Sequence, residues 1–425
     1  MDKMVYKIAL AGLLHDMGKF AERAKMELEP GYENNNSGLY QPDNNPHKRP
    51  THKHALYTAA FVERFAGHIP VFDDKADAAG GNSLINLAAM HHKPETALQW
   101  IIAQSDRLSS GFDRQVFDGD DDGTAIRDFR KTRLIPIAEE LRRGDEFYKS
   151  DSRDSYNYRY PLGKLSPETV FAHQRNNAVP DSNEKAIAEY AGLFEQFCEE
   201  LKSIRHSSAK LWIDSFNALL ERCTALIPAA TVGKVIPDVS LYDHAKATAA
   251  LAAALYQYHH NTGSMTEQAI KDNKPDKFTL ITGDFYGIQN FIFSEGGSTN
   301  RSAAKLLRGR SFAVSLLSEL AARSLCNALG LPATSILLNA AGKFTILAPT
   351  LPEVAQQIST TENELNDWLL QAYYGEVSIG FSSIQAAPAD FEKGNFPGLW
   401  EKLVKAAERK KFRKLGLDQT GAVKG

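Results

Sequence analysis

The chain of 425 residues is 43% hydrophobic and 24% charged, which predicts a folded protein of roughly two to four domains. Its net charge of −3 excludes a general attraction to nucleic acid, so any such contact must come from local patches. Three widely spaced cysteines without a CxxC pair favour a reducing, cytoplasmic location and exclude a zinc module built from cysteines, and no apolar run is long enough to span a membrane.

The N-terminal stretch combines an apolar helix with two candidate metal ligands. Residues 1–20 are predicted to form a helix that ends at the adjacent pair His15 and Asp16. An imidazole next to a carboxylate at the end of a buried helix suits a divalent ion. Residues 28–51 are rich in Asn, Pro and Gly, and we predict a long surface loop there.

The next predicted helices carry the remaining candidate ligands. Each of these segments repeats apolar residues at helical spacing. They are 51–67 with His54, 83–92 with His91 and His92, and 95–108 with Asp106. An acidic, Gly-rich loop is predicted over 110–125. Further helical blocks are predicted at 133–143, 183–205, 210–227 and 243–260.

After residue 276 the hydrophobic period changes, and strands begin to alternate with helices. The order β-α-β-β-α-β is that of a ferredoxin-like domain. The predicted elements are strand 277–284, helix 300–329, strands 335–339 and 343–347, helix 353–372 and strand 375–384. A basic amphipathic helix over 399–414 follows. The predicted fold class is α+β, with an all-helical domain before the ferredoxin-like one.

Six side chains from the first hundred-odd residues are candidate ligands of one metal centre. Imidazoles and carboxylates without thiolates suit Mn, Fe, Ni or Zn. Two ions bridged by one carboxylate would clamp the attacking and leaving oxygens of a phosphodiester, and Asp16 is the natural bridge. Lys19, one turn further, would neutralise a phosphate oxygen. The candidate ligands are His15, Asp16, His54, His91, His92 and Asp106.

Alternatives stay open for several of these residues. The histidines are also compatible with ordinary positions on helix surfaces or in the core, and His52 competes with His54 for one ligand position. A helix that begins at Glu95 would put Asp106 roughly 16 Å from its start. Asp106 therefore joins His92 at one ion only if that helix begins later or crosses back.

Several segments, in order, resemble the large subunit of type III-A CRISPR effector complexes. The resemblance covers nearly the whole chain, and the stretches that begin at Asp238 and Gly283 are the specific ones, whereas His-Asp alone is not. The segments are Leu13-Leu-His-Asp-Met-Gly-Lys-Phe20, Met90-His-His-Lys-Pro94, Ser105-Asp-Arg-Leu-Ser-Ser-Gly111, Ile227-Pro-Ala-Ala-Thr231, Asp238-Val-Ser-Leu-Tyr-Asp-His244, Gly283-Asp-Phe-Tyr-Gly-Ile-Gln-Asn-Phe-Ile-Phe293 and Leu307-Arg-Gly-Arg-Ser-Phe312.

The resemblance implies a permuted HD-type nuclease that cuts single-stranded DNA with Mn, Ni or a similar ion, one or two per site. It also implies two palm domains, the second of which carries a Gly-Gly-Asp-Asp turn and makes cyclic oligoadenylate from ATP with Mg. Both activities of the family respond to target RNA paired with a guide RNA, which the small and backbone subunits hold. We expect His15, Asp16 and Lys19 to be the catalytic residues here.

The ferredoxin-like domain departs from a catalytic palm at one turn. A palm cyclase needs paired carboxylates between its second and third strands to hold Mg on ATP phosphates. Here that turn is Ala340-Ala-Gly-Lys343, so we interpret the domain as the first, non-catalytic palm, and we expect ATP and Mg only with a second palm. We interpret the acidic cluster over 118–123 as a solvated loop. The chain is then expected to be an N-terminal piece of a longer protein, or a split version of one.

Two groups of residues in the palm region have a weaker functional prediction. Glycines allow close backbone approach and arginines pair with phosphate, so a set around the first palm helix is a candidate nucleotide site. The alternative, which we favour, is that these residues shape the palm. The set is Gly283, Gly287, Arg308, Arg310 and Ser311. The basic stretch 408–414 either contacts RNA or solvates a helix.

The sequence thus predicts four regions and one leading function. The regions are an HD-type core over 1–130, a helical continuation and linker over 131–270, the first palm over 271–395, and a basic helix with the start of a downstream region over 396–425. The leading hypothesis is a metal-dependent single-strand DNA nuclease within a guide-RNA complex. The alternatives are an assembly scaffold with an idle HD site and an HD phosphohydrolase that acts on nucleotides.

Overall fold

The computed structural model describes residues 3–42, 51–72, 77, 79–113, 128–139, 156–293, 303–392 and 394–412. It divides the chain into two compact units. One unit is Tyr6–Ala252, and the other is Ala253–Gly425 with Met1–Val5. The first is helical and the second contains a four-stranded sheet, which confirms the predicted α+β class. In the part of the chain that the structure describes, every helix is too short or too polar to cross a bilayer.

The first unit is a helical domain with an aromatic core. Phe20 of α2 packs edge-on against Phe194 of α9, with ring centroids 5.0 Å apart, and Phe61 of α4 reaches the same cluster. The elements are α1 Lys3–Leu14, α2 Met17–Arg23, α3 Tyr32–Tyr40, α4 Lys53–Arg64, η1 Ala66–His68, α6 Leu84–Ala89, α7 Ala97–Asp113, η3 Ile137–Glu139, β1 Tyr158–Arg159, β2 His173–Gln174, α8 Arg175–Ala178, α9 Asn183–Lys202, α10 Ala209–Thr224 and the start of α11 Leu241–Asn261.

The predicted helix over 1–20 is interrupted at the metal-ligand pair. α1 ends at Leu14 and α2 begins at Met17, so His15 and Asp16 occupy the break. Thr58 of α4 satisfies the backbone there: its hydroxyl donates to the His15 carbonyl oxygen at 2.8 Å and accepts from the Gly18 N–H at 3.0 Å. The break therefore lies against α4, and the His15 carbonyl and the Gly18 N–H both have hydrogen-bond partners there.

The loop predicted over 28–51 is wrong in its middle, where α3 forms. Tyr40 is buried with Leu56 of α4 and Met90, and Tyr32 packs against the same cluster. Lys53 also binds Glu33 of α3, with its ammonium 2.8 Å from the carboxylate. Burial of the two tyrosines outweighs the poor helix propensity of the three consecutive asparagines, a signal that residue composition alone does not contain. Residues 43–50 lie outside the described residues.

Two further expectations are corrected or untested. α7 continues to Asp113, so the loop predicted over 110–125 is wrong for residues 110–113, and residues 114–127, with the acidic cluster 118–123, lie outside the described residues. The helical block predicted over 133–143 contains only the 3₁₀ turn η3 in its described part. Arg133 is buried and paired with Glu189 of α9, which fixes an irregular segment there.

The second unit has the predicted β-α-β-β-α-β order. Its sheet is antiparallel throughout, with strand order β4-β5-β3-β6. β3 lies centrally, and Gly283 pairs with Phe344 on one side and with Phe381 on the other. The elements are α12 Glu267–Lys271, β3 Phe278–Tyr286, α13 Ile288–Phe293, α14 Ala303–Ala328, η5 Ala333–Ser335, β4 Ile336–Ala340, β5 Lys343–Pro349, α15 Val354–Tyr373, β6 Ser378–Ala386, η6 Pro388–Phe391 and α16 Phe396–Lys411.

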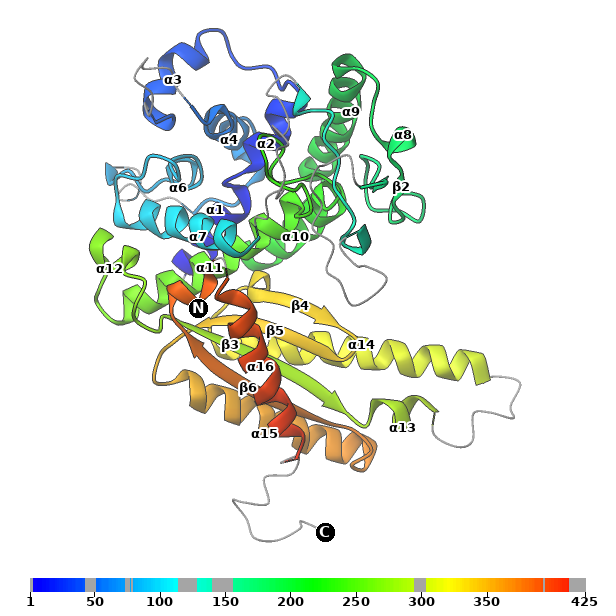
Figure 1. Ribbon diagram of the computed structural model, residues 1–425. Helices are drawn as coiled ribbons and strands as arrows, with labels where there is room; N and C mark the ends of the chain where they lie inside the picture. Colours follow the sequence, from blue (N-terminus) through cyan, green and yellow to red (C-terminus); the bar gives the residue numbers. More distant parts are fainter. Residues whose placement is uncertain are drawn as a thin grey trace. The chain divides into compact units, whose positions relative to one another are not determined.

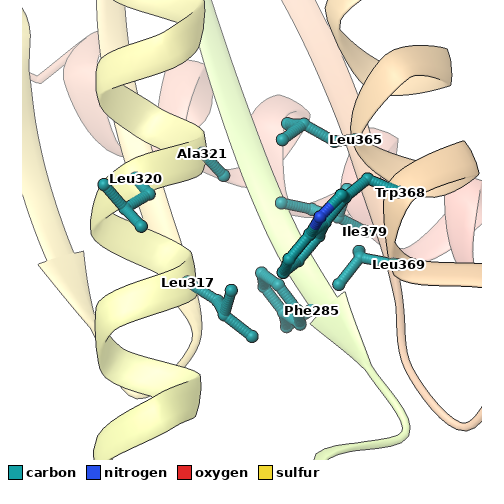
Figure 2. A pocket seen from close by; sticks show the side chains of 8 residues that line it. All are labelled: Phe285, Leu317, Leu320, Ala321, Leu365, Trp368, Leu369 and Ile379. Carbon is teal, nitrogen blue, oxygen red and sulfur yellow. The ribbon is translucent and has the colours of Figure 1, made fainter. Parts of the chain in front are cut away.

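Helices cover both faces of this sheet. α16 crosses one face along β6 and β3, whereas α14 and α15 lie on the opposite face (Figure 1). Between α14 and α15 an apolar pocket opens, with Leu317 and Leu320 on one side, Trp368 on the other, and Phe285 and Ile379 at its floor (Figure 2). The lining side chains favour apolar contacts over a phosphate.

A buried lysine precedes the first strand of the sheet. Lys277 is 1% exposed, and its ammonium donates to the Ala269 and Ile270 carbonyl oxygens of α12 at 2.6 and 3.1 Å. Burial lowers the pKa of Lys277 from 10.5 to about 8. The unfolded chain therefore binds more protons at this residue between those two values.

The first prediction concerns stability against pH. The free energy of unfolding of the wild type, relative to Lys277→Met, should rise as pH increases from 8 to 10.5 and stay level below pH 8, because the folded state loses this proton first. Urea unfolding at a series of pH values measures the difference. A flat difference across this range would show that Lys277 is not desolvated in the folded state.

Candidate metal centre

Imidazoles and carboxylates of the first unit converge in two clusters. His15, Asp106 and His244 form one, which we call the inner cluster. His54, His91 and His92 form the other, which we call the outer cluster. In each cluster the potential ligand atoms all lie within 4.8 Å of one another.

The inner cluster joins three helices in the interior of the unit. His15 follows α1, Asp106 belongs to α7 and His244 belongs to α11. The Nε2 atom of His244 lies 3.1 Å from Asp106 Oδ1 and 3.3 Å from His15 Nε2. His15 is 0% exposed, His244 1% and Asp106 9%. Three ligand atoms thus meet in a nearly closed space.

The outer cluster joins α4 to the segment that follows α6. The Nε2 atoms of His54 and His92 face each other at 2.9 Å, and His91 lies beneath them with 2% exposure. His54 and His92 are partly exposed. His52, just before α4, has a left-handed backbone conformation with φ of 58°, and its ring packs against that of His92 with centroids 4.0 Å apart and a tilt of 40°. This cluster therefore reaches the surface.

Asp16 connects the two clusters. Its Oδ2 atom lies 3.5 Å from His15 Nε2 and 3.4 Å from His244 Nε2. Its Oδ1 atom lies 3.4 Å from His54 Nε2 and 3.9 Å from His91 Nε2. One carboxylate therefore presents an oxygen to each cluster. The ammonium of Lys19 also forms an ion pair with Asp16 Oδ2.

The donor atoms fit a divalent cation. The Nδ1–H groups of His15 and His91 donate to the Gly12 and Ala88 carbonyl oxygens at 2.7 and 2.8 Å, because a carbonyl can only accept. Each Nε2 atom is thereby left with its lone pair, the arrangement that holds ligating histidines in place. Among the described residues, the buried His91 Nε2 has no hydrogen-bond partner, as expected for an atom that ligates an ion.

The electrostatics of the site also favour metal binding. Burial lowers the pKa of His91 to about 4, and burial likewise lowers the pKa of His54 and His92, so these rings are neutral ligands at pH 7. Burial raises the pKa of Asp16, but Lys19 and the surrounding histidines outweigh burial and hold that pKa well below its usual range. Asp16 is therefore a carboxylate, which is the form that binds a cation.

Two glycines permit the close helix contacts on which the clusters depend. A Cβ atom at Gly12 would lie 2.6 Å from the Cα atom of Ala249, so α1 and α11 touch through their backbones. A Cβ atom at Gly18 would lie 1.8 Å from the carbonyl oxygen of His54. The first contact brings His15 to the α11 side of the inner cluster, and the second brings α2 to the His54 end of α4.

The second prediction tests the glycine contact beside the outer cluster. Gly18→Ala should lower the free energy of unfolding by about 1–3 kcal/mol or more, because the methyl group would overlap the His54 carbonyl and force α2 away from α4. Urea unfolding measures the loss. Gly38→Ala is the matched control, since the space around that position on α3 is open, and it should change stability by less than about 1 kcal/mol. Equal effects of the two substitutions would contradict the close-contact account.

The structure brings together all six of the ligands predicted from the sequence, with differences in grouping. Asp106 joins His15 and His244, and not His92, because α7 begins at Ala97 and directs this carboxylate toward α1 and α11. His54 rather than its rival His52 belongs to the outer cluster. Whether these side chains bind an ion stays a prediction.

His244 is the one member of the clusters that the sequence analysis missed. It lies 138 residues after Asp106, near the start of an otherwise apolar helix. The segment Asp238–His244 was noted for its resemblance to a family, but no spacing links it to the earlier histidines. One sequence signal for His244 exists: it lies one turn into a helix with many apolar residues, where a histidine is expected to be buried.

The weaker candidates in the palm lie at packed positions. A Cβ at Gly283 would overlap the ring of Phe344, and Gly287, with φ of +82°, lies against the Glu376 carbonyl oxygen. The run that contains Arg308, Arg310 and Ser311 lies inside α14, which begins at Ala303. Arg310 lies over the ring of Phe291, 5.8 Å from its centroid. A nucleotide role for this set stays a prediction.

Two family models match the chain. Residues 2–111 match the HD domain, and residues 277–423 match the Csm1 subunit domain B. The first match contains the break between α1 and α2, both outer-cluster segments and Asp106. The second contains the four-stranded sheet and α16. The resemblance inferred from the sequence is thus confirmed for both parts of the chain.

Curated relatives extend the similarity across both units. A single-strand-specific deoxyribonuclease Cas10/Csm1 of the subtype III-A CRISPR system from Methanocaldococcus jannaschii is 27% identical over 96% of this chain and 50% of its own length. The protein of the same description from Thermococcus onnurineus is 26% identical over 98% of this chain and 48% of its own. The chain therefore spans about half the length of the relatives it matches.

Solved structures show the same fold. The crystal structure of Csm1 from T. onnurineus has a TM-score of 0.65 at 21% identity and covers 97% of this chain and 50% of that one. A Csm1–Csm4 cassette in complex with AMPPNP has a TM-score of 0.65 at 22% identity over 98% of this chain. A third structure is described as a Csm1–Csm4 cassette in complex with cA4, with a TM-score of 0.63.

Proposed function

We propose that this chain is a divalent-metal-dependent nuclease that cuts single-stranded DNA as part of a type III-A CRISPR effector. The observation that carries the proposal is the Asp16 carboxylate, which presents one oxygen to each of two ligand clusters. The HD-domain match and the relatives described as single-strand-specific deoxyribonucleases support the same activity.

The chemistry follows from the donor set. Divalent cations bound at such a site lower the pKa of water and neutralise negative charge on a phosphodiester. The protein's part is to hold five imidazole Nε2 atoms and two carboxylates in fixed positions, with Asp16 between the clusters. Nitrogen and oxygen ligands without thiolates favour Mn, Fe, Co, Ni or Zn, and we propose Mn or Ni.

Lys19 is proposed to contact the scissile phosphate. Its ammonium pairs with Asp16 at the inner face of the site and is 16% exposed, so it lies between the carboxylate and solvent. A cation that binds Asp16 would compete with Lys19 for Oδ2 and free the ammonium for a phosphate oxygen. The same lysine would then weaken cation binding and assist cleavage.

The palm is proposed to act without metal chemistry of its own. Its β4–β5 turn has no carboxylate, and both Ala341 and Gly342 have positive φ. The nearby Asp284 of β3 is 5% exposed and faces Lys343 and Lys411, each with its ammonium 3.5 Å away. The described carboxylate beside this turn is thus paired with two lysines, and the turn itself offers no second carboxylate for Mg, so ATP and Mg are expected only with a second palm.

The partners follow from the relatives by analogy. Solved neighbours are described as Csm1 bound to Csm4 within a type III-A interference complex. We propose that this chain assembles with a Csm4-like subunit and with the guide and target RNA that such a complex holds. Co-purification of the chain with that subunit, with and without guide RNA, tests the assembly.

The third prediction addresses the nuclease itself. Purified protein with Mn should degrade single-stranded DNA, and Asp16→Asn should slow degradation at least about 100-fold, because the amide presents neither cluster with a charged oxygen. Release of labelled fragments from a single-stranded oligonucleotide measures the rate.

The control for this experiment is Asp181→Asn, a change at a carboxylate that is 92% exposed and lies in neither cluster. It should leave the rate unchanged. If Asp16→Asn cuts DNA as fast as the control, the nuclease proposal is wrong. Turnover of free nucleotides without DNA cutting would favour the phosphohydrolase alternative.

The fourth prediction separates the two roles of Lys19. Lys19→Met should bind Mn at least about threefold more tightly, because a competing positive charge beside Asp16 is removed. The same variant should cut DNA about tenfold more slowly, because the phosphate loses its cationic contact. Calorimetric titration and the cleavage assay measure the two effects. Weaker Mn binding together with slower cutting would instead indicate that Lys19 only maintains the fold.

A further inference from the structure

The two clusters differ in fixed charge. Asp106 gives the inner cluster a carboxylate of its own, whereas the outer cluster consists of three imidazoles. Both share Asp16, whose charge is already offset by Lys19. Among the described residues, no lysine or arginine pairs with Asp106, whose Oδ1 atom faces the imidazoles of His15 and His244 and accepts from the Ser110 hydroxyl at 3.4 Å. The inner cluster therefore holds a buried carboxylate that no described lysine or arginine neutralises.

Such a carboxylate binds cations strongly. The Asp106 side chain is 9% exposed, so little water screens the attraction between its oxygens and a positive charge. A divalent ion at the inner cluster would supply that charge and would also link α1, α7 and α11. Cation sites bind more tightly as the number of anionic ligands increases.

The outer cluster has the opposite properties. His54 and His92 are partly exposed, and the ring of His52 at the surface packs against that of His92. Its three neutral rings bear no charge that requires compensation, and water reaches two of them. An ion there would exchange with solvent more easily than one enclosed by His15 and His244.

We propose that the two clusters are unequal metal positions: the inner one fills first and retains its ion as part of the fold, whereas the outer one fills second and exchanges. The inference rests on the proposed metal site but not on DNA cutting. It also means that the supply of metal in solution sets the occupancy of the outer position while the inner one stays filled.

The fifth prediction uses matched single-ligand variants of the full chain. Asp106→Asn keeps the shape of an inner ligand without its charge, and His92→Gln removes an outer ligand at the partly exposed edge. Each protein is loaded with excess Mn, treated briefly with a chelator and desalted, and its Mn content is measured by elemental analysis. The wild type and His92→Gln should each retain about one ion per chain, and Asp106→Asn should retain none.

Thermal unfolding without and with Mn gives a second readout that is independent of activity. Mn should raise the unfolding temperature of the wild type and of His92→Gln but not that of Asp106→Asn. Circular dichroism of the metal-free proteins checks that each variant is folded.

The outcomes distinguish this inference from the nuclease proposal. Retention of the ion by Asp106→Asn, its loss from His92→Gln, or loss of all Mn from the wild type after desalting would each overturn the inference. If the retention pattern is found but the wild type does not cut DNA, the unequal positions stand and the nuclease proposal fails. If the wild type cuts DNA but the retention pattern is absent, the nuclease proposal stands and the unequal positions are wrong.

Discussion

The arrangement of the helical unit depends on one buried carboxylate, Asp16, at a break between two helices. Its two oxygens face the imidazole of the neighbouring His15 and imidazoles from three other parts of the chain, and the ammonium of Lys19 offsets its charge. A carboxylate in such a position is tolerated only when its surroundings supply opposite charge or hydrogen bonds. Thr58 satisfies the backbone of the break, and the absence of side chains at Gly12 and Gly18 allows the neighbouring helices to approach it.

Much of the candidate site could be predicted from short-range patterns. The pair His15 and Asp16 and the pair His91 and His92 each close an apolar helix, so their common burial follows from hydrophobic period alone. The grouping could not be predicted in this way, because it depends on helix directions that no local pattern records. Asp106 is one of the six predicted ligands, but the sequence does not tell which histidines it joins, and α7 directs it to His15 and His244. His244 lies 138 residues after Asp106 in the sequence, so no local pattern links the two.

For the fold, too, local patterns predict the elements that they alone determine and miss those that depend on tertiary packing. The β-α-β-β-α-β domain was predicted element by element, since each strand and helix there has its own period and the order allows few topologies. Helix α3 was not predicted, because its three asparagines are poor helix formers and only the burial of Tyr32 and Tyr40 against α4 compensates. The pairing of Asp284 with Lys343 and Lys411 also could not be predicted from the sequence, since Lys411 belongs to the distant helix α16.

The hydrogen bonds from Nδ1 of His15 and His91 to carbonyls three residues earlier have an evolutionary consequence. Each ring has two tasks at opposite ends: one nitrogen fastens it to its own helix, and the other offers a lone pair inward. A carboxylate cannot donate, and the two groups of a carboxamide diverge from a single carbon, so neither spans the same gap. No exchange among His, Asp, Glu and Asn at these two positions therefore preserves both contacts, and any such substitution gives up either the bond to the helix or the inward lone pair.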